Sequence, residues 1–177
     1  MRKIGFAGWG AVLVVLMAIV RPVHAQAPKS ELLGSYRSWD AFRAKTADGL
    51  ICYMVSEPDE WDASRDGVRR GDIYITVAHK PEQNIRDEVN VVVGYPFKDA
   101  GEALAVIDGT VSFTMFTQGD GAWNSEARAD ARMVQAMKKG LKLVVTGTSS
   151  RGTITTDTYS LSGFTAAHNA ISDACRV

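Results

Sequence analysis

Two cysteines and three histidines are the residues of this chain whose side chains most readily do chemistry. Cys52 and Cys175 are the only cysteines, and the chain has no C-x-x-C motif. In an exported protein such a pair predicts a structural disulfide. Two free buried thiols, or a redox site, are the alternatives. A bridge over so long a loop would stabilise the fold by roughly 4–5 kcal/mol on a chain-entropy argument.

His79 and His168 are the candidate general bases outside the N-terminal leader. His79 falls on the apolar side of an expected strand over 72–80, and His168 on the apolar stripe of an expected C-terminal helix. These positions favour buried structural histidines.

A periplasmic hydrolase that uses His168 or His79 is the alternative. Ser149 or Ser160 would then act with His168 and Asp157 as a triad. The sequence has no G-x-S-x-G motif to mark a nucleophile.

Motifs for metals and cofactors are absent from the sequence. It contains no H-x-H, no H-E-x-x-H, no EF-hand calcium loop and no glycine-rich nucleotide motif. We therefore predict that the protein uses neither a metal nor a cofactor.

The N-terminus has the pattern of a Sec signal peptide over residues 1–25. Arg2 and Lys3 precede an apolar run over 4–20, and Val23-His24-Ala25 supplies small residues for cleavage after Ala25. Cleavage after Ala27 and an uncleaved anchor are the alternatives. The pattern predicts export to the periplasm. Exposure at the outer surface and secretion are the alternatives to a periplasmic location.

The expected mature chain, residues 26–177, has the length of a single domain. Cleavage removes three of the 20 basic residues and none of the 20 acidic ones, which leaves a net charge of −3. This charge excludes the basic excess of a nucleic-acid-binding protein. No second apolar run is long enough to cross a membrane, and the oligomeric state stays open.

Alternating apolar residues predict strands over 50–56, 72–80 and 88–95, and a hairpin over 103–116. The hairpin turns at Asp108-Gly109. A two-residue turn would pair Val106 with Val111 and Leu104 with Phe113, so that apolar residues share one face.

The second half of the chain combines two helices with another hairpin. We expect one helix to end near Lys139, a hairpin over 141–161 of undetermined register, and a last helix from Ser162. Strands first and helices last predict an α+β, mainly β fold. We expect an antiparallel, sandwich-like domain of about seven or eight strands.

The stripe Arg128, Arg132 and Lys139 is the best candidate partner surface, on the polar side of the expected first helix. Its alternative is the solvated side of an amphipathic helix. Trp61 lies in a charged segment, so we expect it to be exposed and to mark an interface, whereas Trp39 and Trp123 should be core residues.

Several short motifs occur in a characteristic order. They are Trp39, ICYMVSEP around Cys52, Gly94-Tyr95-Pro96, GDGAW at 119–123, AMKKG at 136–140, S-x-R-G-T at 149–153, DTYSLSGFTAA at 157–167 and Cys175. In this series the chain resembles the invasion-associated locus B (IalB) family of secreted alphaproteobacterial envelope proteins. The resemblance implies a link to host-cell invasion and no agreed enzymatic activity. Many members of the family have additional cysteines.

These observations favour a secreted or periplasmic, non-enzymatic envelope protein that acts by binding. Its partner would be an unidentified envelope or host protein, and its role would be in host-cell invasion or envelope integrity. The alternatives are the hydrolase described above and a carrier with a pocket for a small apolar ligand.

Overall fold

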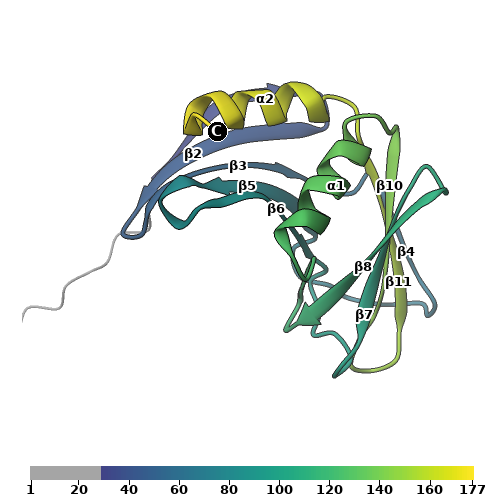
Figure 1. Ribbon diagram of the computed structural model, residues 1–177. Helices are drawn as coiled ribbons and strands as arrows, with labels where there is room; N and C mark the ends of the chain where they lie inside the picture. Colours follow the sequence, from purple (N-terminus) through teal and green to yellow (C-terminus); the bar gives the residue numbers. More distant parts are fainter. Residues whose placement is uncertain (1–28) are drawn as a thin grey trace, which may run out of the picture.

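The computed structural model describes residues 29–177, which form one antiparallel sheet of eleven strands with two α-helices (Figure 1). The expected signal peptide lies outside the described residues. The mainly β, α+β class is confirmed.

Strands and α-helices alternate little along the chain, because nine of the eleven strands precede the first α-helix. They are β1 Ser30–Tyr36, β2 Trp39–Thr46, β3 Gly49–Ser56, β4 Glu60–Ala63, β5 Tyr74–Lys80, the 3-10 turn Pro81–Gln83, β6 Ile85–Val92, β7 Glu102–Ile107, β8 Val111–Gln118, β9 Gly121–Trp123, α1 Ala127–Met137, β10 Lys142–Thr148, β11 Ile154–Ser160 and α2 Phe164–Cys175.

The prediction of a sandwich with seven or eight strands is wrong. The strands form a single open sheet in the order β1-β2-β3-β5-β6-β9-β8-β7-β10-β11-β4. The sheet curves strongly, and α2 lies along β2 and β3 while α1 lies beside β6 (Figure 1). Helices therefore cover the buried face where a sandwich would place a second sheet.

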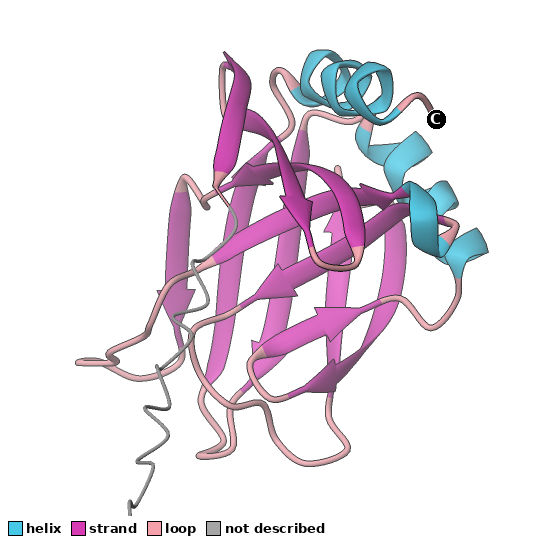
Figure 2. Cartoon of the chain, turned by 90° about the vertical axis from the view of Figure 1, so that its left-hand side faces the viewer, coloured by secondary structure: helices cyan, strands magenta, loops and turns pink. Residues whose placement is uncertain are grey.

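Both helices gather in the upper right part of the view in Figure 2. Their apolar sides join one core cluster with the buried face of the sheet. In α1 the buried side includes Met133, Val134 and Met137, as predicted, whereas Ala127 is exposed. In α2 the predicted stripe Phe164, His168, Ile171 and Cys175 is buried.

The predicted register of the β7–β8 hairpin is wrong by one residue. Ile107 pairs with Val111, so the loop holds Asp108, Gly109 and Thr110. Asp108 and Gly109 both have positive φ, which a primed turn requires, and Thr110 is the additional residue.

This extra residue changes which side chains of β7 face the core. Ala103, Ala105 and Ile107 are buried, whereas Leu104 is 44% exposed. A shift of one residue exchanges the two faces of a strand. The length of the turn therefore determines that Leu104 faces away from the core, whereas the apolar pattern alone had placed it on the core face.

The start of α2 is fixed against the turn between β1 and β2. Gly163 precedes the helix with φ 90°, and a Cβ there would lie 1.8 Å from the carbonyl oxygen of Tyr36. Trp39 packs edge-to-face on Phe164 and donates its indole N–H to the carbonyl oxygen of Ser160. Trp39 is fully buried, as predicted, while Trp123 is half-buried.

Candidate functional site

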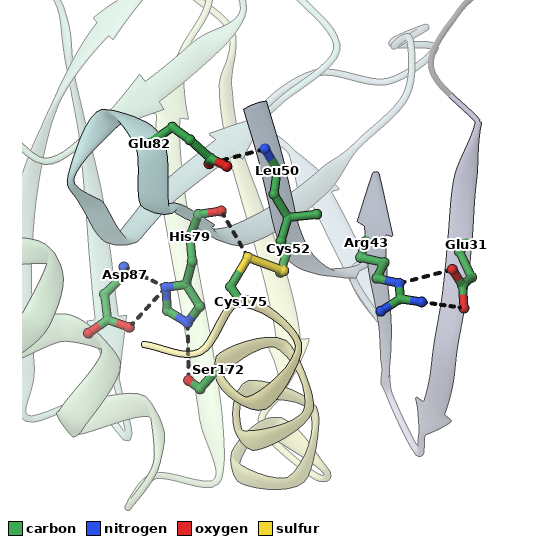
Figure 3. The surroundings of a disulfide bond; sticks show 9 residues. All are labelled: Glu31, Arg43, Leu50, Cys52, His79, Glu82, Asp87, Ser172 and Cys175. Atoms are coloured by element: carbon green, nitrogen blue, oxygen red, sulfur yellow. Dashed lines mark hydrogen bonds and ion pairs between the residues drawn. A yellow bond between two sulfur atoms is a disulfide. The ribbon is translucent and has the colours of Figure 1, made fainter. Parts of the chain in front are cut away.

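The two cysteines form the predicted disulfide, which joins β3 to the last residue of α2 across 123 positions of sequence. The Cα atoms of Cys52 and Cys175 are 5.9 Å apart. Cys52 pairs with His79 in the sheet, so the disulfide lies directly beside that histidine (Figure 3).

A buried polar network surrounds His79. Its Nδ1 accepts the backbone N–H of Asp87 at 3.1 Å, and its Nε2 lies 3.1 Å from Ser172 Oγ. His168 Nε2 lies 2.7 Å from Asp87 Oδ1, and His168 Nδ1 lies 3.4 Å from Ser172 Oγ. The four residues thus form a closed ring of contacts between β5, β6 and α2.

One set of protons satisfies this ring. His79 donates from Nε2 to Ser172, Ser172 donates to His168 Nδ1, and His168 donates from Nε2 to the Asp87 carboxylate. His79 is then neutral. Burial lowers its pKa to about 4, partly opposed by the charge of Asp87.

Asp87 remains ionised in this arrangement. Its burial favours the neutral acid, but the hydrogen bond donated by His168, together with the electrostatic effect of the nearby basic groups, outweighs burial and the pKa is lowered. The predicted structural role of both histidines therefore has a physical basis: 0% of His79 and 2% of His168 is exposed, and each ring nitrogen has a partner.

His79, Asp87 and His168 are also the kind of donor set that binds Zn²⁺, with ligand atoms within 4.8 Å of one another. The ring lone pairs of His79 and His168, however, already accept hydrogen bonds in the proton arrangement above. A metal would have to displace the Asp87 N–H from His79 and the proton between Asp87 and His168. The hydrogen-bonded ring explains the cluster without a metal.

The proposed hydrolase residues are not brought together. Asp157 forms a bidentate ion pair with Arg70. Ser149 Oγ accepts the N–H of Thr153 in the β10–β11 turn, and Ser160 Oγ accepts the N–H of Ser162. His168 instead contacts Asp87 and Ser172.

Sequence reasoning missed Asp87 and Ser172. Ser172 follows His168 by four residues, a spacing that places both on one side of a helix and was available as a signal. Asp87 comes near through the pairing of β5 with β6, whose register the residue pattern did not predict.

Ser172 is poorly placed as a nucleophile. It lies inside α2, where its backbone N–H is taken up by the helix and is not free to act as an oxyanion-hole donor. Its hydroxyl is shared between two histidines. The cluster therefore has the Ser-His-Asp contacts of a triad, but it is buried under α2.

The three basic residues predicted as a partner surface line one groove. It lies between α1 and the β7–β8 hairpin and has a volume of about 550 Å³. The apolar side chains of Ile107, Val111, Ala131 and Ala136 line it together with Arg128, Arg132 and Lys139. The arginines are exposed, so an apolar groove here has a basic rim.

Trp61 is 49% exposed, as predicted, but lies elsewhere, on the edge strand β4. The guanidinium of Arg70 lies 5.4 Å from the centre of its ring and 5.2 Å from that of Tyr95. Trp61 does not line the groove with Arg128, so the structure separates the four predicted residues into two places.

The fold and the covered disulfide define a β-rich domain closed by its C-terminal helix. The sequence profile described as "Invasion associated locus B (IalB) protein" matches residues 39–172. The chain belongs to the IalB family.

A solved structure agrees with this membership. The crystal structure of invasion associated protein B from Bartonella henselae is 15% identical, with a TM-score of 0.55 over 84% of this chain and 99% of that chain. At this identity the similarity shows the fold. No curated protein matches the chain. None of the helices within residues 29–177 is long and apolar enough to span a membrane.

Proposed function

We propose that this IalB-family protein is an exported envelope protein that acts by binding an acidic partner in the groove between α1 and the β7–β8 hairpin. The basic rim on an apolar groove is the observation that carries the proposal. Apolar contacts supply affinity in such a groove, and the arginines select carboxylates and orient them.

The charge of the groove comes from residues that are free to meet a partner. Arg128, Arg132 and Lys139 take part in no ion pair within residues 29–177. Asp108 also lines the groove, but its carboxylate accepts the backbone N–H groups of Leu141 and Lys142. The net charge presented by the groove is therefore positive.

A binding role also agrees with the hydrogen bonding and burial of the polar cluster around His79 and His168. Within residues 29–177, histidine, serine and carboxylate meet in a closed hydrogen-bonded ring under α2. The larger cavities of the described residues open at the surface, and the interior is filled by side chains such as Met54, Met115 and Met133. This favours a surface partner over a carried apolar ligand.

Charge reversal tests the groove directly. Arg128→Glu with Arg132→Glu should abolish capture of the acidic partner from envelope extracts while the melting temperature stays within about a degree. Lys98→Glu together with Lys45→Glu is the matched control, because both lysines are exposed and outside the groove. Equal capture by wild type and the groove variant would remove this surface from consideration.

Location is tested separately, by protease treatment of intact cells with a periplasmic control protein. Digestion in intact cells would support a surface location and direct host contact. Protection until the outer membrane is opened would support a periplasmic location and an indirect role in invasion.

The hydrolase alternative predicts turnover of an ester or amide substrate that is lost in His168→Ala or His79→Ala. Hydrolysis that persists in both folded variants would eliminate it. The Ser172–His168–Asp87 contacts are the observation that makes this test worth doing.

A further inference from the structure

Three segments far apart in sequence meet around a second cleft. The loop 65–69, the segment Gly94-Tyr95-Pro96 and the β10–β11 turn line a cavity of about 530 Å³. The cleft shares no lining residue with the groove at α1. Two of its segments are sequence motifs that the proposed function leaves unused.

Backbone hydrogen bonds hold these segments against one another. The N–H of Ser150 donates to the carbonyl oxygen of Pro96 at 2.9 Å, and the N–H of Gly71 donates to the carbonyl oxygen of Gly94 at 2.8 Å. Gly94 has φ 68°, and a Cβ there would lie 2.6 Å from the Gly71 carbonyl oxygen. The base of the cleft is therefore pre-formed.

Buried polar groups support that base. Arg70 makes a bidentate ion pair with Asp157 and donates from Nε to the carbonyl oxygen of Val93. The Tyr95 hydroxyl lies 2.6 Å from Thr155 Oγ1. Asp157 thus neutralises the charge of Arg70. The contact between the Arg70 guanidinium and the Tyr95 ring holds Tyr95 as one wall of the cleft.

The rim has an excess of positive charge. Arg65, Arg69 and Arg151 line the cleft, are exposed, and take part in no ion pair within the described chain, against the single carboxylate Asp66. Ser150 and Thr153 add hydroxyl groups. Guanidinium forks and hydroxyls on a rigid base are the groups that bind phosphate oxygens.

We propose that this cleft is a second binding site, for a phosphate ester, held by Arg65, Arg69 and Arg151 against the Tyr95 wall. Each guanidinium offers paired N–H donors to phosphate oxygens. The aromatic wall and Pro96 leave an apolar surface for the group that carries the phosphate. A free phosphate ester and a phospholipid headgroup share this chemistry.

The experiment uses the mature chain and two probes. In the first experiment, inorganic phosphate is titrated into the protein while the NMR shifts of the backbone amides are recorded. In the second, co-sedimentation of the protein is measured with vesicles of phosphatidylcholine alone and with vesicles of phosphatidylcholine mixed with phosphatidylglycerol. We expect saturable shifts at 65–69 and 149–155 that weaken with added salt. Arg69→Gln with Arg151→Gln should weaken binding about tenfold or more.

Lys45→Gln with Lys98→Gln removes the same charge at exposed residues outside both clefts and is the control that should bind as wild type does. Arg151→Lys keeps the charge and loses the fork, so it should bind more weakly than wild type and better than Arg151→Gln. Saturable phosphate binding supports a free ester, and binding only to phosphatidylglycerol vesicles supports a headgroup. Neither binding, or binding equal in the cleft variant and wild type, overturns the proposal.

Discussion

Arg70 and Asp157 form a buried bidentate ion pair, with contacts of 2.5 and 2.6 Å and side chains that are 2% and 1% exposed. The pair joins the loop after β4 to the centre of β11. A carboxylate buried in the core of a protein destabilises the fold unless its charge is paired. This contact therefore attaches the loop that carries Arg70 to the sheet, and it places the Arg70 guanidinium over the rings of Trp61 and Tyr95.

Removing one member of this pair should destabilise the fold strongly. Asp157→Asn leaves the Arg70 charge buried without its partner and should lower the free energy of unfolding by about 3–5 kcal/mol. Urea unfolding measures the change. The double variant Arg70→Met with Asp157→Leu should recover much of the loss, and a double variant less stable than either single one would contradict this account.

Loss of the disulfide should lower the melting temperature by several degrees. Cys175→Ser releases the end of α2 from β3 and should cost about 2–5 kcal/mol. Calorimetry with and without reductant measures it. Reductant should lower the melting temperature of wild type and leave a variant lacking both cysteines unchanged. Equal melting of reduced and oxidised wild type would show that the bridge contributes nothing.

Stability should fall on acidification between pH 6.5 and about 4. The pKa of His79 is about 4 in the folded protein and 6.5 in the unfolded chain, so below pH 6.5 the unfolded state binds the proton first. The loss should reach about 3 kcal/mol at pH 4. The lowered pKa of Asp87 removes further stability only at lower pH, as that carboxylate is protonated.

His79→Gln is the control for this pH dependence. Glutamine keeps a donor and an acceptor but does not titrate, so the variant should show a flatter stability profile between pH 6.5 and 4 in urea unfolding. A profile as steep as that of wild type would assign the proton uptake to another group.

The hydrogen bonds of Asp130 explain why this acidic residue lies on the apolar side of α1. Its Oδ1 accepts the backbone N–H of Val89 at 3.1 Å and the side-chain N–H of Asn124 at 2.9 Å. Asp130→Ala leaves the Val89 N–H without this acceptor and Asn124 Nδ2 with only the Met133 sulfur, and it should cost about 1–3 kcal/mol of unfolding free energy. Glu126→Ala, at an exposed neighbour, should change it by less than about half a kcal/mol. Equal effects in urea unfolding would contradict this role.

Local periodicity predicted much of what lies on single elements. The buried sides of α1 and α2 and the face of β5 that carries Ile75, Val77 and His79 were all predicted from spacing. Local pattern suffices here because these faces repeat with the period of one element. It failed at Leu104, where an additional turn residue changed the register.

The sequence by itself determined the mainly β class, the family resemblance, the disulfide partners and the amphipathic helices. Only the tertiary structure decided that the strands form one open sheet, that Asp87 and Ser172 complete the ring around the histidines, and that Arg70 pairs with Asp157. These contacts join residues 81 or more positions apart, or depend on strand register. Such pairings follow from the packing of the whole chain, whereas short-range spacing places only Ser172 beside His168.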